Sequence, residues 1–309
     1  MRQLSAAGRS LLSVLCGAML GFVARPPLPS APEPAQLGQR AVVLLAAGDI
    51  AYCANLSGAR ATAQILGSVD GEITALGDRA YPDATSQEFP DCYGPTWGHY
   101  KNRTHPAAGN HEYHSSGAEP YFTYFGVAAG EPGKGYYSYD LGAWHIVVLN
   151  SNCEKIDGGC KAGSPQEQWL KDDLAAHRTT CTLAYWHHPL FSSGPYPSHA
   201  QSSFMTDLWK DLYNAHADIV LNGHEHKYER FALQDVDGHA DPKGIREFVV
   251  GTCGALQDGF RRNPREVRDT GHFGVLKLVL DLDSYQWEFL GEDAGSFHDT
   301  GGGKCHGRS

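Results

Sequence analysis

Three short apolar segments of this chain each lead into a glycine that is followed by an aspartate or an asparagine. The polar residues are Asp49, Asp78 and Asn110, and they are spaced 29 and then 32 residues apart. Each spacing is about the length of one strand–helix–strand unit. Because crossovers between parallel strands are right-handed, successive units place their strand ends along one edge of a sheet. The sequence therefore predicts an α/β fold in which these three side chains lie close together.

Two histidine-containing loops repeat this pattern later in the chain. His187 and His188 follow one apolar segment, and His224 and His226 follow the next. A lone Gly-Asp pair more often forms a turn that caps a helix, whereas five such loops in order indicate one shared site at the carboxyl ends of the strands. Since alternation along a strand would send His224 and His226 to opposite faces, we expect the chain to bend at Gly223. Carboxylate, amide and imidazole groups together suit first-row transition metals rather than calcium.

The remaining pattern predicts helices between these strands, a hairpin, and a β-rich carboxyl-terminal part. Helical periodicity is found in residues 58–66, 165–177 and 202–217. Ser164 followed by Pro165 is typical of a helix start. Alternating polarity in residues 135–141 and 144–150 predicts a β-hairpin that turns at Gly142. Further strands are expected at residues 227–234, 246–251, 273–280 and 285–290.

Taken together, these loops resemble the five ordered motifs of the calcineurin-like metallophosphoesterases, and among these they are most similar to the purple acid phosphatases. The motifs are Gly48-Asp49, Gly77-Asp78-Arg79-Ala80-Tyr81, Gly109-Asn110-His111-Glu112, His187 and Gly223-His224-Glu225-His226. The resemblance runs from about residue 40 to about residue 290. It implies a four-layer αββα sandwich, in which two mixed sheets are flanked by helices. It also implies a metal-dependent phosphoric ester hydrolase.

The resemblance further implies two metal ions that share one ligand, Asp78. The ligands implied for the first ion are Asp49, Asp78, Tyr81 and His226. Those implied for the second ion are Asp78, Asn110, His187 and His224. The shared carboxylate would hold the ions about 3.5–4 Å apart. The resemblance implies a ferric ion paired with zinc, manganese or ferrous iron, and attack on phosphorus by a metal-bound hydroxide.

The roles of the residues beside the predicted ligands stay open. We interpret His111 as the general acid, or as a charge stabiliser at the leaving group, and the alternative is a histidine that orients a ligand. His188 is interpreted as a support for the ligands or as a wall of the pocket. Many calcineurin-like enzymes have a histidine where this chain has Ala51, and the Tyr81 position fits the purple acid phosphatase pattern instead. Tyr52 stays an alternative neighbour of the first metal.

The amino-terminal segment lies outside the predicted domain. Arg2 and Arg9 precede an apolar run that has the form of a secretory signal and is too short to span a bilayer comfortably. Residues 1–24 are thus predicted to be a signal peptide, and because the usual small residues of a cleavage site are missing, an uncleaved membrane anchor is the alternative. Residues 25–39 are rich in proline and alanine and predict an extended linker. Residues 40–309 then form one metallophosphoesterase domain.

The cysteines are consistent with export, because an oxidising compartment lets cysteines pair. The chain has 8 of them. The expected disulfides are Cys53 with Cys92, Cys153 with Cys160, and Cys253 with Cys305. The first two pairs would tie loops on or near the catalytic face, and Cys181 would remain a buried free thiol. The alternative is that several cysteines are small buried apolar residues.

The formal net charge of −10 argues against binding to the backbone of nucleic acids. The sequence therefore predicts an exported phosphatase, secreted or in the cell envelope, that hydrolyses small-molecule phosphate monoesters. It would contact a membrane only through an uncleaved anchor. A phosphodiesterase or nucleotidase working from the same site is the alternative. A further alternative is a non-catalytic protein that has lost its active site. Every predicted ligand position, however, carries a side chain that can bind metal.

Overall fold

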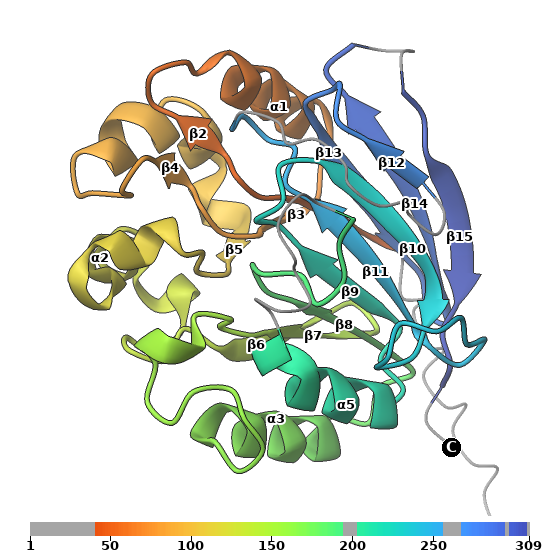
Figure 1. Cartoon of the computed structure of the whole chain (residues 1–309). Coiled ribbons are helices and arrows are strands. Elements are labelled where there is room, and N and C mark those ends of the chain that lie inside the picture. The colour runs from red at the N-terminus through yellow and green to blue at the C-terminus, as the bar shows by residue number, and fades with distance from the viewer. Residues whose placement is uncertain (1–40, 194–202, 256–266, 294–296, 308–309) are drawn as a thin grey trace, which may run out of the picture. The chain divides into compact units, whose positions relative to one another are not determined.

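The computed structural model describes residues 41–193, 203–255, 267–293 and 297–307 (Figure 1). The chain divides into two compact units, residues 1–37 and 38–309, and every described residue belongs to the second unit. The predicted signal or anchor and the predicted linker therefore lie outside the described residues. Within the described ranges, no helix combines the length and the apolar character needed to cross a bilayer.

Six strands of the described chain form the first sheet, and it is mixed. The order is β15 (Thr300–Lys304), β14 (Ser284–Gly291), β13 (Gly274–Leu280), β1 (Val42–Ala47), β3 (Glu72–Ala75) and β5 (Thr104–Pro106). Strands β1, β3 and β5 are parallel, and β13 to β15 pair in antiparallel fashion beside β1. The predicted neighbourhood of the strands that precede Asp49, Asp78 and Asn110 is thus confirmed.

A further seven described strands form the second sheet, which is also mixed. The order is β12 (Val267–Asp269), β10 (Tyr228–Gln234), β11 (Ile245–Val250), β9 (Ile219–Asn222), β8 (Cys181–Tyr185), β7 (Trp144–Val148) and β6 (Tyr137–Leu141). Strands β7, β8, β9 and β11 are parallel. Strands β6 and β7 form the predicted hairpin, with Leu141 opposite Trp144.

The two sheets share one hydrophobic core, and the second sheet has another core on its outer face. In β7, Ile146 and Val148 belong to the core that contains residues of both sheets, whereas Val147 between them belongs to the core formed with helices. Successive side chains of a strand point to opposite faces, so a strand covered on both faces has a continuous apolar sequence. This accounts for the unbroken apolar runs that precede the histidine loops.

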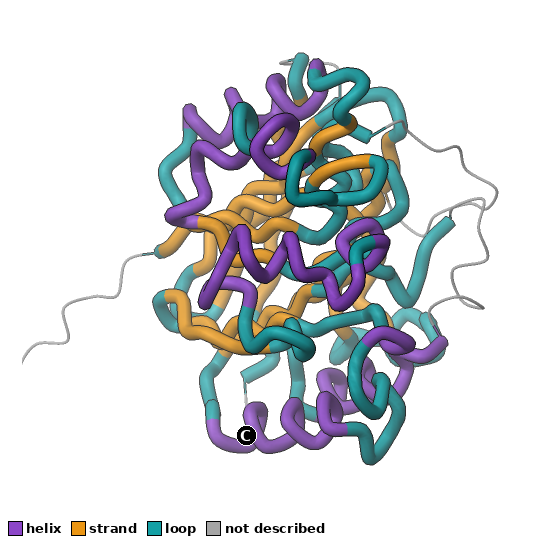
Figure 2. The backbone as a smooth tube through the Cα atoms, turned by 90° about the vertical axis from the view of Figure 1, so that its left-hand side faces the viewer, coloured by secondary structure: helices purple, strands orange, loops and turns teal. Residues whose placement is uncertain are grey.

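Helices cover the outer faces of the two sheets (Figures 1 and 2). Helix α1 (Ser57–Ser68) lies against β13 of the first sheet. Helices α3 (Pro165–Ala176) and α5 (Thr206–Asn214) cover the second sheet through residues such as Leu170 and Leu208. The predicted sandwich of two mixed sheets flanked by helices is therefore confirmed. Shorter helical segments are α2 (Glu119–Phe125) and Phe89–Tyr93, Trp97–Arg103, His111–His114, Ser116–Ala118, Gly126–Ala129, Cys153–Lys155 and Ser203–Met205.

One helix starts where the local sequence predicts it, and one strand forms where the local sequence predicts none. Ser164 caps α3, because its hydroxyl accepts a hydrogen bond from the backbone N–H of Glu167 at 3.2 Å. Strand β15 contains three successive glycines, which predict no strand. It forms because glycine lets its backbone approach β14 closely: a Cβ atom at Gly301 would lie 2.2 Å from the Trp287 ring.

A buried histidine joins the hairpin to α3. His145 Nδ1 lies 2.9 Å from Asp140 Oδ1, and its Nε2 lies 2.8 Å from Asp173 Oδ2. The ring stacks on His177 with the ring centres 4.2 Å apart. Burial lowers the pKa of His145, but the hydrogen bonds and charges of the two aspartates outweigh burial and raise it above its usual value. The protonated form of His145 therefore binds β6 and β7 to α3.

Two of the three predicted disulfides are confirmed, and the third prediction is wrong. The structure contains Cys53–Cys92 and Cys153–Cys160, together with Cys181–Cys305, and leaves Cys253 as a buried free thiol.

The pairing of Cys253 with Cys305 was predicted wrongly because strand β15 was not predicted. The backbone N–H of Cys305 donates to Asp283 O in the turn between β13 and β14, which lies at the amino ends of β1 and β8. Cys253 follows β11 at the opposite edge, where its N–H donates to Gly48 O.

Candidate metal centre

Asp49 and Asp78 lie side by side at the carboxyl ends of β1 and β3. The backbone N–H of Asp49 donates to Gly77 O at 3.1 Å, and that of Ile50 donates to Asp78 O at 2.8 Å. The two loops continue in parallel as β2 (Ala51–Tyr52) and β4 (Ala80–Tyr81). Asp49 and Asp78 have φ angles of 61° and 50°, in the left-handed region that costs energy for residues other than glycine. Both carboxylates are buried.

The hydroxyl of Tyr81 contacts the other three side chains of the first predicted ligand group. It lies 2.7 Å from Asp49 Oδ1, 3.1 Å from Asp78 Oδ2 and 3.1 Å from His226 Nε2. His226 Nε2 is also 3.3 Å from Asp49 Oδ1. The structure thus places the phenol of Tyr81, and not that of Tyr52, among the first group of residues.

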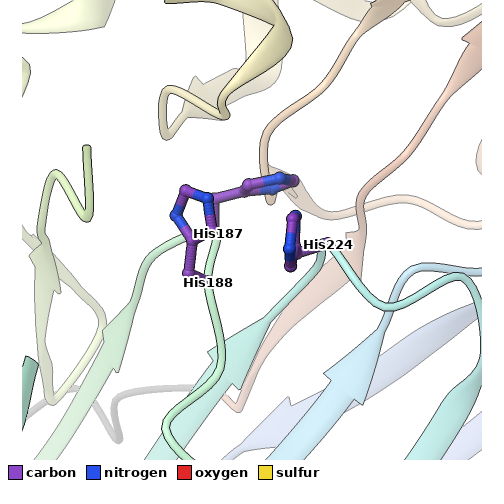
Figure 3. Close-up of side chains that lie close together, drawn as sticks. All are labelled: His187, His188 and His224. Carbon is purple, nitrogen blue, oxygen red and sulfur yellow. The ribbon is translucent and has the colours of Figure 1, made fainter. Parts of the chain in front are cut away.

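The second predicted ligand group meets around the amide of Asn110. Asn110 Oδ1 lies 3.0 Å from His187 Nε2 and 3.0 Å from His224 Nδ1. His187 Nε2 is also 3.1 Å from Asp78 Oδ2, so Asp78 contacts both groups. His187 Nδ1 donates to Leu76 O at 2.8 Å, which directs Nε2 toward the carboxylate. Figure 3 shows His187 at the end of β8 and His224 on the neighbouring loop, with their rings gathered at this edge.

The separations among these atoms fit the inner coordination shells of two ions. Ligand atoms about 2.0–2.2 Å from a metal lie about 3 Å apart when they are neighbours in its shell. The nitrogen and oxygen contacts in the two groups range from 2.7 to 3.3 Å. Two carboxylates without solvent exposure also require positive charge nearby. The residues present therefore fit two metal ions, with Asp78 as the common ligand.

The bend that brings His224 and His226 to the same side falls on His224 itself. The predicted bend at Gly223 is wrong in this detail, because His224 has the positive φ angle, 70°. Gly223 is required for space instead: a Cβ atom there would lie 2.8 Å from Asp49 Oδ2 and 2.8 Å from Leu76 O. The backbone N–H of His224 donates to Asp49 Oδ2 at 2.8 Å, which fixes this loop against the first carboxylate.

The electrostatics of the group favour ionised carboxylates. Burial raises the pKa of Asp78 and of Asp49, but the neighbouring imidazoles, chiefly His187 for Asp78 and His226 for Asp49, outweigh burial and lower both. Burial lowers the pKa of His187, and Asp78 reverses this and raises it to about 9. Burial, together with the charges of the two aspartates, raises the pKa of the Tyr81 phenol well above its usual value. A phenolate at Tyr81 therefore requires a cation beside it.

His111 faces the same pocket without belonging to either group. Its Nδ1 hydrogen-bonds Pro82 O, and its Nε2 points inward, 3.7 Å from Asp78 Oδ2. The ring lies on Tyr81 with the ring centres 4.2 Å apart, and the side chain is 23% exposed. Because the carbonyl occupies Nδ1, Nε2 is the ring nitrogen that faces the pocket. A proton on that atom can reach both the pocket and solvent.

His188 supports the centre from the other side. Its Nδ1 lies 2.8 Å from Ser151 Oγ, and its ring centre is 4.4 Å from that of His224. Burial and the neighbouring imidazoles lower its pKa well below the usual value, so the ring is neutral. This position agrees with its interpretation as a support and as a wall of the pocket.

Glu112, for which no role was predicted, holds two of the loops together. Its carboxylate accepts hydrogen bonds from the backbone N–H groups of Asp78, Arg79 and Gly109, at 3.0, 2.8 and 2.6 Å. Its position two residues after Asn110 in the third motif was the only signal available. Such a buried carboxylate fixes the distance between the Asp78 loop and the Asn110 loop.

Arg79 supplies the charge that balances Glu112. The guanidinium is fully buried, with Nη1 3.4 Å from Glu112 Oε2. Its Nη2 donates to the carbonyl oxygens that end β3 and follow β5, those of Ala75 and Ala107. It also lies over the rings of Tyr121 and Phe125. Arg79 and Glu112 thus form one buried unit beneath the candidate metal centre.

Comparison with known proteins gives a family for this arrangement. The family model described as Calcineurin-like phosphoesterase matches residues 35–228. The chain belongs to this family. The predicted family is therefore confirmed, and membership together with the purple acid phosphatase relatives described next implies a dinuclear metal centre.

The relatives of this calcineurin-like chain include purple acid phosphatases of Arabidopsis thaliana. Purple acid phosphatase 22 is 32% identical over 165 residues, which cover 50% of this chain and 36% of the relative. Purple acid phosphatase 23 is 31% identical over 197 residues, which cover 58% of this chain and 41% of the relative. The matches thus span less than half of either relative.

Solved structures agree on the fold. A purple acid phosphatase from yellow lupin (Lupinus luteus) seeds matches with a TM-score of 0.67 at 19% identity, over 85% of this chain and 53% of that one. A dimetal phosphatase from Danio rerio matches with a TM-score of 0.60 at 14% identity, over 84% of this chain and 98% of that one. At these identities the likeness concerns the fold.

Proposed function

We propose that this chain is an exported phosphatase that hydrolyses phosphate monoesters at a centre of two metal ions. The observation that carries the proposal is the position of Asp78, whose Oδ2 contacts both Tyr81 of the first group and His187 of the second. One carboxylate between two sets of nitrogen and oxygen ligands is the arrangement needed for two ions that act on one phosphoryl group.

The assignment of ligands follows the two groups. The first ion is assigned to Asp49, Asp78, Tyr81 and His226. The second ion is assigned to Asp78, Asn110, His187 and His224. A phenolate ligand favours ferric iron at the first position, with zinc, manganese or ferrous iron at the second. When bound, the ions would activate a water as nucleophile and neutralise the phosphoryl oxygens.

The protein's own residues then bind and orient the ester and move one proton. His111 Nε2 faces the pocket from the side of Tyr81, and Pro82 O holds its other ring nitrogen. We assign His111 as the acid that donates a proton from Nε2 to the departing ester oxygen. Glu112 and Arg79 keep the two loops at a fixed distance, so Asp78 and Asn110 stay aligned during the reaction.

Export is supported by the cysteines. Three disulfides among the described residues are compatible with an oxidising, extracytoplasmic location, because such bonds are rare in the cytosol. The apolar amino-terminal segment, which lies outside the described residues, would serve as the signal or the anchor.

Two measurements test the proposed function. Purified protein should contain about two equivalents of metal and should hydrolyse a nitrophenyl phosphate faster than the corresponding bis-ester. Preference for the bis-ester would favour a phosphodiesterase on the same site. A protein that stays free of metal in excess iron, zinc and manganese would contradict both readings.

A further inference from the structure

A cavity of about 510 Å³ adjoins the candidate metal centre on the side of the second ligand group. Its wall includes His188 after β8, Ser151 after β7, and the loop that the Cys153–Cys160 disulfide closes. The ends of β7 and β8 are neighbours in the parallel part of the sheet, so the cavity opens at the same edge as the centre. Its volume is in the range of pockets that bind small organic molecules, about 300–1,000 Å³.

His188 connects the cavity to the metal centre. Its neighbour His187 is assigned as a ligand, and its ring lies 4.4 Å from that of His224. Ser151 Oγ accepts a hydrogen bond from the backbone N–H of His188 at 3.0 Å and lies 2.8 Å from His188 Nδ1. An ester bound at the centre can extend along this ring into the cavity.

The rest of the lining combines an apolar body with charge. The ring of Phe204 lies 6.1 Å from that of His188, edge to face, and the Cys153–Cys160 disulfide forms part of the wall. Lys155 and Lys161 supply two positive charges, against one negative charge from Glu154. Among the described residues, neither lysine amine is within ion-pair distance of a carboxylate. This net positive charge stands out on a chain whose formal charge is −10.

We propose that this cavity binds the organic group of the phosphate ester and selects esters whose organic group carries a second negative charge. The inference rests on the proposed function, because it assumes that the phosphoryl group binds at the two-metal centre. The apolar wall suits an aromatic group or one of nucleoside size, and the two lysines suit a carboxylate or a further phosphate at its far end.

The test compares two aryl phosphates of the same shape. 4-Carboxyphenyl phosphate carries a charged carboxylate, and 4-carbamoylphenyl phosphate carries a neutral amide in the same place. We expect kcat/KM to be about fivefold higher for the carboxylate in the wild type, as for a solvent-accessible ion pair. Lys155→Ala and Lys161→Ala should each lower this ratio, and Lys155→Glu should reverse it. Lys304→Ala is the matched control, because this exposed lysine ends β15 near the opposite edge of the sheets.

The two proposals fail in different ways. If no phosphate ester is hydrolysed, the proposed function is wrong. If both esters are hydrolysed but the ratio is the same in the wild type and the lysine variants, only the cavity proposal is wrong. A direct binding measurement gives a second readout: calorimetry with 4-carboxybenzylphosphonate, which is not hydrolysed, should show a Kd that rises in Lys155→Ala and Lys161→Ala. An unchanged Kd would contradict the proposal.

Discussion

Replacing Glu112 by glutamine is expected to destabilise the metal-free protein by about 3 kcal/mol. The substitution keeps the shape but removes the negative charge that three backbone N–H groups and Arg79 share. Removing one partner of a buried ion pair costs about 3–5 kcal/mol, because the other charge stays buried without compensation. The lower end applies here, since Arg79 keeps two carbonyl acceptors and two aromatic rings.

Urea unfolding of the metal-free variant, followed by tryptophan fluorescence, measures this effect. A loss of about 3 kcal/mol corresponds to a midpoint lower by about 1 M urea for a domain of this size. Glu119→Gln is the matched control, because Glu119 is exposed at the start of α2 and should change stability by less than about 0.5 kcal/mol. In the double variant Arg79→Met/Glu112→Gln, the loss should be smaller than the sum of the two single losses. A midpoint for Glu112→Gln within the range of the control would refute the reasoning.

Three further predictions concern the centre and one distant histidine. Asp78→Asn should empty both metal positions, whereas His111→Ala should retain both metals and lose about 10²–10⁴-fold in kcat. Metal analysis of both variants separates these roles, and a His111→Ala protein without metal would contradict the role assigned to His111. Iron-loaded protein should be pink to purple through charge transfer from the Tyr81 phenolate to ferric iron, and Tyr81→Phe should remove the visible band that Tyr52→Phe leaves; a colourless wild type would refute the ligand assignment. The pKa of His145 is raised by its two aspartate partners despite burial, so its contribution to stability is complete below the unfolded-state pKa of about 6.5 and is lost as pH rises through the folded-state pKa. The difference in unfolding free energy between wild type and His145→Gln should therefore shrink from pH 5 to pH 9, about the range over which histidine titrates, and a difference that grows with pH would show that the neutral ring is the stabilising form.

The order of the site loops could be predicted from sequence because period and spacing determine it. Apolar runs that end in Gly-Asp and recur at the spacing of a strand–helix–strand unit indicate parallel strands, and neighbouring parallel strands in one sheet bring Asp49 and Asp78 together. The hairpin and the start of α3 were predictable for a similar reason, since alternation and a Ser-Pro start are local signals.

Contacts made by residues far apart in the sequence could not be predicted in this way. The partner of Cys305 depends on β15, whose glycines carry no strand signal and are explained by close neighbours on β14, the Trp287 ring at Gly301 and the Tyr285 ring at Gly303. Glu112 looks like any acidic residue at a helix start, and its three N–H partners lie on two loops. The position of the bend at His224 depends on space left by neighbouring loops rather than on its own sequence.

The left-handed backbone at Asp49, Asp78 and His224 has a consequence for protein engineering. Glycine would adopt each of these conformations without strain, at a gain on the order of 1 kcal/mol per position. In the two aspartates, however, the same change would leave His187 and His226 without their carboxylate partners, and removing one partner of a buried ion pair costs about 3–5 kcal/mol. A library of metal-free protein screened only for heat resistance would therefore enrich glycine at His224, and the most stable variants would lack a predicted ligand of the second ion. Directed evolution of this protein should therefore measure metal content in every round.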